Sequence, residues 1–292
     1  MNYTNLLILG SSGYIGKNLI EGLEGKYTIF HPTRTELDLL DSKAVEAYFT
    51  THTIDVVIHC GIVGGSRKEE YSENAFYVNT RMFHNVVRNK KYFKKMIFLG
   101  SGAEYDKSKS LIKVKEEEFD KFVPEDEYGF HKYVCSKFIE QVDYIVNLRI
   151  FGMFGKYEDH KLRFISNAIC KNLLDEPIEM NQDVYFDYVL IDDFVRIVDY
   201  FINNDSKYKF YNIGRGVAIN LLTIAGKINQ ISGHKTKILV QKPGLNKEYT
   251  CNNSRLMKEI SNFQFTDFDK SLKELYLWYK NNMNTFNKDF FN

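Results

Sequence analysis

The chain has 292 residues, 44% hydrophobic and 26% charged, the usual balance of a globular protein large enough for one α/β domain with a smaller appendage. Its formal net charge of +1 lacks the basic excess of proteins that bind nucleic acid or acidic membranes, so we expect neither partner. No apolar run approaches the ~18 residues of a membrane helix, and the four cysteines form no CxxC pair, so we expect a cytoplasmic protein with reduced thiols and no metal site.

Short β-type runs alternate with helical patterns through the first half of the chain. The sequence predicts strands at 5–9, 26–30, 55–60, 95–99 and 144–150. It predicts helices at 14–23, within 42–49, at 72–88 and at 128–141. This alternation is typical of parallel βαβ units, so the expected fold class is α/β, a Rossmann-type doubly wound parallel sheet with helices on both faces.

After Phe151 the alternation becomes irregular, and loops with glycine and proline separate shorter elements. This pattern predicts a smaller C-terminal part that covers a substrate. We place the dinucleotide-binding domain at residues 1–155. Residues 156–292 would form mainly the substrate-binding part, interleaved with the end of the sheet.

A glycine motif, Gly10-Ser-Ser-Gly13-Tyr-Ile-Gly16, follows the first predicted strand and opens the first predicted helix. Its glycines suit a tight turn, a close approach of backbone to a pyrophosphate, and close packing of helix on strand. The helix N-terminus would supply amide donors for the phosphates. The alternative is an ordinary glycine-rich turn, but the position between strand and helix favours a dinucleotide site that includes Tyr14 and Ile15.

Arg34 lies after the second predicted strand, where an NAD-preferring site usually has an acidic residue. An acid would repel a 2′-phosphate, whereas a guanidinium can bind it through two hydrogen bonds. Arg34 therefore favours NADP(H), although a surface arginine beside an adenine ring is the alternative. Asp38 and Leu39, which follow, can flank the adenine.

Tyr128 and Lys132 stand four residues apart at the start of a predicted helix, which places them on one face. The reference pKa of tyrosine is near 10, and a nearby ammonium favours its phenolate, so the phenol becomes a usable proton carrier. Ser101, at the end of the fourth strand, can hydrogen-bond the same substrate oxygen, at the sheet edge where α/β folds bind ligands.

The order and spacing of these motifs identify the chain as a member of the short-chain dehydrogenase/reductase family. It most resembles the extended branch that acts on nucleotide sugars, and within it the GDP-fucose synthases. The resemblance covers the chain to about Leu256. It rests on five further segments and on the pair Asp192-Asp193; the segments are 33–41, 63–65, 98–101, 147–152 and 212–214. It implies a homodimer formed by the helices at 72–88 and 128–141. It implies three catalytic residues, Ser101, Tyr128 and Lys132, and a cofactor site formed by Gly10, Gly13, Gly16, Arg34, Asp38, Leu39, Tyr128 and Lys132.

The departures from the fucose synthases concern epimerisation. Those enzymes carry a cysteine where this chain has Ala103, and a histidine where we align Arg163. Alanine cannot move a proton, although His160 could substitute if the register is shifted. Dehydratases of the family place an acid pair at 102 and 103, and Glu104 falls one place too late. The resemblance therefore implies intact carbonyl reduction and impaired epimerisation.

Substrate binding also departs from the family pattern. Phe186-Asp187-Tyr188 stands where many members have an arginine that binds the diphosphate. Arg163, Lys171 and Lys247 are candidate substrate contacts, and for each lysine an ordinary solvated side chain is the alternative. The likeness to fucose synthases favours a GDP-linked sugar.

We therefore predict an NADPH-dependent reductase of a nucleotide-linked 4-keto-6-deoxy hexose or heptose in surface-polysaccharide biosynthesis. One alternative is a bifunctional epimerase/reductase or an epimerase. Another, of a different class, is a non-catalytic NADP(H)-binding sensor, which would typically have lost Tyr128 or Lys132. Both residues are present.

Overall fold

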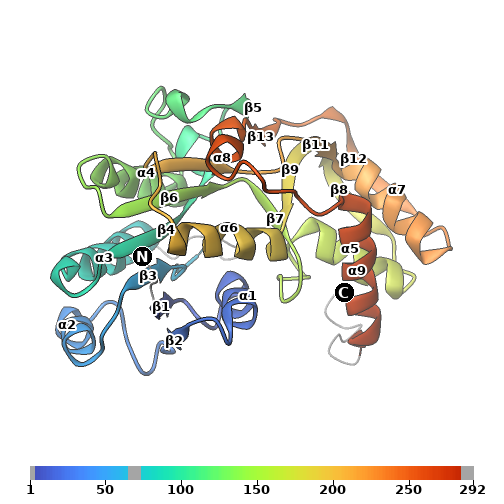
Figure 1. Cartoon of the computed structure of the whole chain (residues 1–292). Helices are drawn as coiled ribbons and strands as arrows, with labels where there is room; N and C mark the ends of the chain where they lie inside the picture. The colour runs from blue at the N-terminus through green and yellow to red at the C-terminus, as the bar shows by residue number, and fades with distance from the viewer. Residues whose placement is uncertain (1–3, 65–73, 284–292) are drawn as a thin grey trace.

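The computed structural model describes residues 4–64 and 74–283, and its larger layer is a six-stranded parallel sheet of order β10-β6-β4-β3-β1-β2 (Figure 1). Its strands are β1 (Asn5–Leu9), β2 (Thr28–Phe30), β3 (Val56–His59), β4 (Lys95–Ser101), β6 (Ile145–Ile150) and β10 (Phe210–Ile213). The helices around it are α1 (Tyr14–Leu23), α2 (Ser42–Thr51), α3 (Ala75–Val87), α4 (Glu127–Ile139) and α6 (Ile191–Asn203). The predicted doubly wound Rossmann-type α/β fold is confirmed.

Two apolar cores cover the two faces of this sheet because successive side chains of a strand point to opposite faces. In β1, Leu6 and Ile8 pack with α1 and α6, whereas Leu7 and Leu9 pack with α2, α3 and α4. All four are almost fully buried, as expected for a parallel sheet covered by helices on both faces.

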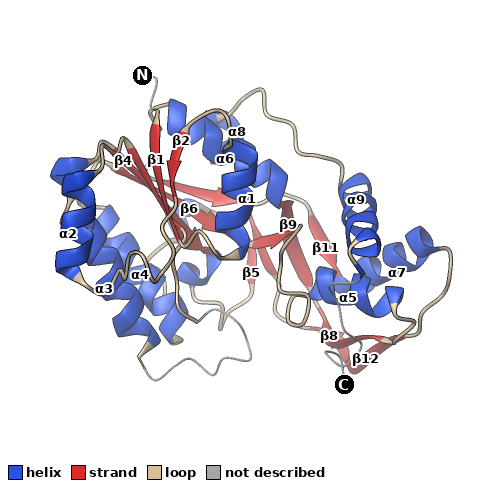
Figure 2. Ribbon diagram, turned by 90° about the horizontal axis from the view of Figure 1, so that it is seen from below, coloured by secondary structure: helices blue, strands red, loops and turns tan. Residues whose placement is uncertain are grey.

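The smaller part of the molecule contains two further sheets (Figure 2). A five-stranded sheet joins β5 (Leu111–Val114), β7 (Gly152–Phe154), β9 (Tyr185–Leu190), β11 (Ala218–Asn220) and β13 (Tyr249–Cys251). A two-stranded sheet joins β8 (Ile178–Asp183) and β12 (Ile238–Leu245). The accompanying helices are α5 (Phe164–Leu173), α7 (Leu221–Ser232), α8 (Ser254–Glu259) and α9 (Phe268–Asn281).

Segments cross the predicted boundary at residue 155 in both directions. Strand β5 precedes the boundary but pairs with β13 of the smaller part. Strand β10 follows the boundary but completes the Rossmann sheet, and helix α6, which also follows it, packs on one face of that sheet. The candidate site therefore forms where the chain passes repeatedly between the two parts.

The predicted helix at 14–23 has the bounds of α1, and the other predicted elements agree within a few residues. The predicted helix at 72–88 corresponds to α3, and residues 72 and 73 lie outside the described residues. The sequence pattern missed β5 and the short 3-10 helices η1 (Lys90–Tyr92), η2 (Gly102–Tyr105) and η3 (Glu116–Glu118). Within the described ranges, no helix is long and apolar enough to cross a membrane.

Candidate active site

The turn between β1 and α1 is the first part of the candidate site. Gly10 has a φ of 84°, and a Cβ there would lie 2.6 Å from the backbone that follows β3. A Cβ at Gly16 would lie 2.3 Å from Gly10 O, so a larger residue at either position would have to move backbone. Tyr14 and Ile15 open α1 directly after Gly13, and no described side chain caps its first amides. These amides and the positive end of the helix dipole suit a phosphate.

The segment after β2 borders this turn. Arg34 is exposed, and no hydrogen bond or ion pair joins it to another described residue. Asp38 is also exposed and accepts a hydrogen bond from Leu40 N at 3.0 Å. Leu39 is buried, and Asn85 Nδ2 donates to its carbonyl oxygen at 2.8 Å. An exposed guanidinium beside a fixed apolar segment fits a phosphorylated adenosine.

Ser101 ends β4 and is held on both sides by η2. Its Oγ accepts a hydrogen bond from Ala103 N at 3.1 Å, and its own amide donates to Glu104 Oε1 at 3.0 Å. This reciprocal arrangement is a capping box, which fixes both the backbone and the hydroxyl of the serine. The strand therefore presents Ser101 at the carboxyl edge of the sheet, as expected from the sequence.

Glu104 supports this edge from within the protein. It is fully buried, and Arg149 Nε donates to its Oε2 at 2.6 Å. Ser136 and Asn147 also donate to the same carboxylate. Buried charges are tolerated when they are paired and hydrogen-bonded in this way. Glu104 is thus committed to an ion pair behind Ser101.

Tyr128 and Lys132 lie on one face of α4, as their spacing predicts. Asp126 caps this helix by accepting a hydrogen bond from Gly129 N at 3.0 Å. Lys132 is buried, and its Nζ lies 5.9 Å from the centroid of the Tyr128 ring. The same ammonium donates to Leu99 O at 2.6 Å. The structure therefore ties the tip of Lys132 to β4, the strand that ends at Ser101.

Two buried histidines beside Lys132 are held neutral. Burial, and secondly the Lys132 charge, lower the pKa of His59 to about 3. The same two causes lower the pKa of His131 to about 2, and His131 Nδ1 lies 3.2 Å from Thr80 Oγ1. Both histidines belong to the packing around α4.

Asn79 of α3 fixes the loop after β3. Its Oδ1 accepts from Val63 N and its Nδ2 donates to Val63 O, both at 2.8 Å. The segment 63–65, singled out in the sequence, begins here, and Gly65 lies outside the described residues.

The model of the NAD-dependent epimerase/dehydratase family matches residues 6–214, which is well over half of the chain and includes every part of the site described so far. The chain belongs to this family. Its fold and the nucleotide-sugar relatives below agree with the resemblance to the extended short-chain dehydrogenase/reductases, and an NAD(P) cofactor is typical of the family.

Three similar proteins carry different activities. GDP-L-colitose synthase from Yersinia pseudotuberculosis is 24% identical over 266 residues, which cover 81% of this chain and 85% of that protein. A GDP-mannoheptose C4 reductase from Campylobacter jejuni, solved with NADP bound, has a TM-score of 0.82 at 20% identity and covers 96% and 99% of the two chains. A UDP-glucose 4-epimerase from Thermotoga maritima, with UDP-glucose, has a TM-score of 0.84 at 19% identity and covers 96% and 100%. At these identities the solved structures show the fold alone.

The candidate substrate cations occupy three separate positions in this member of the epimerase/dehydratase family. Arg163 is exposed at the N-terminus of α5. Lys171, near the other end of α5, forms an ion pair with Glu179 at 2.6 Å. Lys247 is exposed after β12 and donates to Ser108 O.

Glu158 and Tyr14 lie near Arg163, where α5 approaches the turn of the dinucleotide site. Burial raises the pKa of Glu158 to about 8, while a hydrogen bond from Ser166 and the Arg163 charge oppose that shift. Burial and the Glu158 charge also raise the pKa of Tyr14. Arg163 is therefore the candidate substrate cation whose charge reaches the dinucleotide turn.

Asp187 belongs to the segment 186–188, where many family members have an arginine, and it fixes a neighbouring loop. It is buried and accepts hydrogen bonds from Arg215 N at 2.6 Å and Gly216 N at 2.8 Å. Burial raises its pKa to about 6, although the two amides counteract this. The Arg215 side chain lies over the Phe268 ring, and its buried Nε has no hydrogen-bond partner within the described ranges. Sequence reasoning missed Arg215 because it belongs to no motif.

Tyr249 of β13 is a second residue that sequence reasoning missed, and its hydroxyl lies 3.5 Å from Ser101 Oγ. The two residues are 148 positions apart, and no spacing pattern could connect them.

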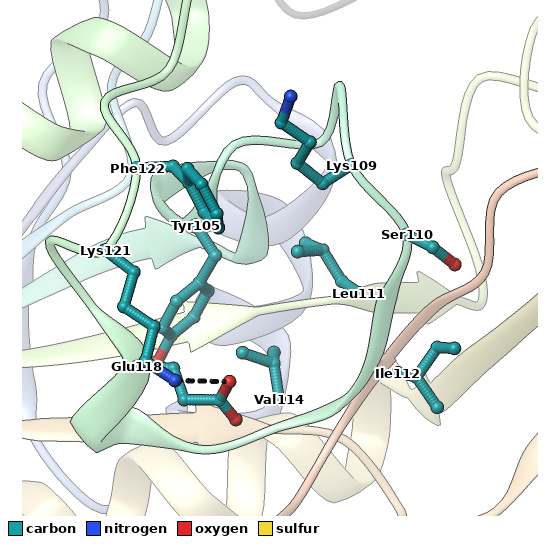
Figure 3. Close-up of a pocket in the computed structure, with 9 residues that line it drawn as sticks. All are labelled: Tyr105, Lys109, Ser110, Leu111, Ile112, Val114, Glu118, Lys121 and Phe122. Atoms are coloured by element: carbon teal, nitrogen blue, oxygen red, sulfur yellow. Dashed lines mark hydrogen bonds and ion pairs between the residues drawn. The ribbon is translucent and has the colours of Figure 1, made fainter.

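A separate cavity of about 180 Å³ is lined by residues of the segment between Ser101 and Tyr128 (Figure 3). Its lining consists of Tyr105, Lys109, Ser110, Leu111, Ile112, Val114, Glu118, Lys121 and Phe122. None of the site residues predicted from the sequence is among them. Lys121 is paired with Glu118 at 3.2 Å, and Tyr105 directs its hydroxyl to Asn212 at 2.7 Å.

Proposed function

We propose that this protein is a cytoplasmic, NADPH-dependent reductase of a nucleotide-linked 4-keto-6-deoxy sugar, a hexose or heptose with GDP as nucleotide, in surface-polysaccharide biosynthesis. The observation that carries the proposal is the joint geometry of Ser101, Tyr128 and Lys132 at the carboxyl edge of the sheet. GDP-L-colitose synthase and the GDP-mannoheptose C4 reductase among the similar proteins support the substrate class.

The dinucleotide site fits NADP(H). The cradle at Gly10 and Gly16 leaves no room for a Cβ, which keeps backbone amides accessible to a pyrophosphate. Arg34 would bind the 2′-phosphate, and Leu39 would contact the adenine. When bound, the reduced cofactor supplies a hydride to the ketone carbon.

The side chains of this chain would then control the proton. Tyr128 donates its phenolic proton to the ketone oxygen as charge develops there, and Ser101 donates a hydrogen bond to the same oxygen. Lys132 stabilises the phenolate that remains, because an opposite charge nearby favours the ionised form.

The absence of epimerase activity is proposed from the surroundings of Ser101. Gly102 has no side chain, and Ala103 is buried and carries only a methyl group. Glu104 is buried in its ion pair with Arg149 and is not available for proton transfer. His160 has its ring 6.5 Å from that of Tyr279, on the side of α9. A bifunctional epimerase/reductase is the second candidate, since GDP-L-fucose synthase from Escherichia coli is 22% identical over nearly the whole chain.

The test is NADPH consumption with enzymatically generated GDP-4-keto-6-deoxymannose in heavy water, followed by mass spectrometry of the product. Reduction without solvent deuterium at carbons 3 and 5, beyond an enzyme-free control, is the expected result. Deuterium at these carbons would replace the simple reductase with the bifunctional enzyme. If neither this ketone nor the corresponding heptose or other nucleotide derivatives are reduced, the proposed function is wrong, and an epimerase or a non-catalytic NADP(H)-binding protein takes its place.

A homodimer through α3 and α4 is part of the proposal. The two helices pack together through the stacked rings of Phe76 and Phe130, 5.0 Å apart. Phe130 of this pair is 36% exposed, and Tyr77, which follows Phe76 in the chain, is 56% exposed. Such aromatic surface suits the core of a protein interface. Sedimentation that shows only monomer at micromolar concentration would remove the dimer.

A further inference from the structure

Tyr249 enters the candidate active site from a part of the chain far from the other site residues. It lies on β13, which joins β5 to β9, and its register neighbours are Leu111 and Phe186. This pairing brings its hydroxyl within 3.5 Å of Ser101 Oγ. The smaller part of the molecule therefore contributes a hydroxyl directly beside the predicted catalytic serine.

The position of Tyr249 is fixed by its neighbours. Its ring packs against Phe151 at 5.0 Å and Phe186 at 5.9 Å between ring centroids. A Cβ on Gly102 would lie 2.6 Å from Tyr249 Oη and 2.8 Å from the Phe151 ring. The glycine after Ser101 thus leaves the space that the tyrosine hydroxyl occupies.

The contact with Tyr249 limits the hydrogen bonds that Ser101 can make. A serine hydroxyl has one proton to donate and two lone pairs that accept. The Ala103 amide already occupies one lone pair at 3.1 Å. If Tyr249 donates to the second, both are filled, and the only remaining hydrogen bond of Ser101 is the one its own proton makes. That proton must then point to a third group.

Tyr249 is suited to remain the donor. Burial is the largest influence on the pKa of Tyr249 and raises it; the hydrogen bond with Ser101 lowers it, and the charge of Tyr128 raises it by a smaller amount. A phenolate at Tyr128 therefore makes ionisation of Tyr249 harder, and Tyr249 keeps its proton through the reaction. The distance of 3.5 Å is long for such a bond, but contacts of this kind shorten when substrate closes the site.

The geometry points to Tyr249 as a positioning residue that donates to Ser101 Oγ and so directs the serine proton to the substrate ketone. This role rests on the proposed function. It also accounts for the glycine at 102, because a Cβ there would collide with the Tyr249 hydroxyl.

The first test is Tyr249→Phe, which removes the hydroxyl and keeps the ring between Phe151 and Phe186. We expect kcat to fall about tenfold, the effect of one lost hydrogen bond in the transition state, with KM for the sugar nucleotide and NADPH affinity unchanged. Tyr276→Phe is the matched control, because its buried hydroxyl bonds to Asn172 at 3.0 Å and not to Ser101. Wild-type kcat in Tyr249→Phe would overturn the proposal.

A double-mutant cycle separates positioning from a general structural effect. Because Tyr249 acts through Ser101, adding Tyr249→Phe to Ser101→Ala should cause no further loss of kcat. Additive losses in the double variant would mean that Tyr249 acts independently of the serine, and the proposal would be wrong.

A third measurement needs no turnover and so distinguishes failure of this inference from failure of the proposed function. Ser101→Cys places a thiol at the same position, and its rate of alkylation as a function of pH reports its pKa, with the unsubstituted chain as background. A donor at Tyr249 stabilises the thiolate, so Tyr249→Phe should raise this pKa by about one unit. An unchanged pKa overturns the role of Tyr249, whatever the substrate. A raised pKa in a protein that reduces none of the candidate ketones supports the contact and rejects only the proposed function.

Discussion

The two sides of the candidate site are assembled in different ways. On the dinucleotide side, the glycines at 10, 13 and 16 lie within seven consecutive residues, and their environment comes from neighbouring strands. On the substrate side, Tyr249 reaches Ser101 from 148 positions away in the chain, and Cys251 of the same strand reaches Asp187 from 64 positions away. A local turn restricts the residue type at each of its positions and so leaves a recognisable sequence pattern. Contacts between distant strands require only that the side chains fit together, and they leave no such pattern. Motifs therefore predict the residues of a local turn and miss residues such as Tyr249, which only the pairing of distant strands brings to the site.

The largest effect expected is on chemistry, where the two sides meet. Tyr128→Phe should lower kcat by about 10²- to 10⁴-fold, because the ketone oxygen loses its proton donor, while NADPH affinity stays nearly the same. Tyr133→Phe, on the same helix, is the control, since its hydroxyl bonds to Asp120. Single-turnover reduction and NADPH titration measure the two quantities. Near-normal turnover in Tyr128→Phe would rule out the proposed mechanism.

The predictability of the fold follows the same division. The period of the apolar residues and the glycine turn were enough to predict the Rossmann sheet, because β1, β3 and β4 are short runs of mostly buried residues that alternate with helices along the chain. Strand β5 was missed because its burial alternates irregularly and its partner β13 lies far along the chain. Its formation depends on that pairing and not on a local pattern.

The candidate site was predictable to a similar extent. Ser101, Tyr128 and Lys132 were found from spacing, and the structure places them at one edge of the sheet. The long-range contacts around Ser101 could not be derived, because Arg149 reaches Glu104, and Tyr249 reaches Ser101, only through the tertiary fold.

The second-largest effect tests the support behind Ser101. Glu104→Gln keeps the size of the side chain but removes the charge that Arg149 faces in the interior. Loss of one partner of a buried pair should lower the free energy of unfolding by about 3–5 kcal/mol. Glu118→Gln, which breaks the surface pair with Lys121, should cost less than about 1 kcal/mol. Urea unfolding of both variants measures the difference, and equal losses would contradict the importance assigned to the buried pair.

A smaller effect concerns Glu158, near which the dinucleotide turn and α5 meet. Its folded pKa of about 8 lies above its ordinary value near 4.5, so the folded state holds the proton more tightly than the unfolded state. Stability is therefore highest at acidic pH with respect to this group, and is lost as the pH rises from about 4.5 to about 8.

Glu158→Gln should remove that loss. The variant should match the wild type at pH 5 and exceed it by about 2–4 kcal/mol at pH 9. Glu125→Gln, at an exposed position, provides the control. Urea unfolding at the two pH values is the measurement. Equal stability of wild type and Glu158→Gln at pH 9 would mean that the charge at this junction is compensated.

The smallest effect expected is on the choice of cofactor. It tests whether Arg34 selects NADP(H), as the sequence of the dinucleotide side predicts. Arg34→Asp replaces a guanidinium that can bind a 2′-phosphate with a charge that repels it. We expect NADPH affinity to fall about 10- to 100-fold, while NADH affinity stays equal or rises, because an acid can accept a hydrogen bond from the free ribose hydroxyl. Arg88→Asp, an equal change of charge at an exposed position after α3, should alter neither affinity. Fluorescence titration with NADPH and NADH measures both affinities. If the NADPH affinity of Arg34→Asp is unchanged, Arg34 is only a surface arginine. The residue that selects the cofactor would then have to be found from the tertiary structure, as Tyr249 was on the substrate side.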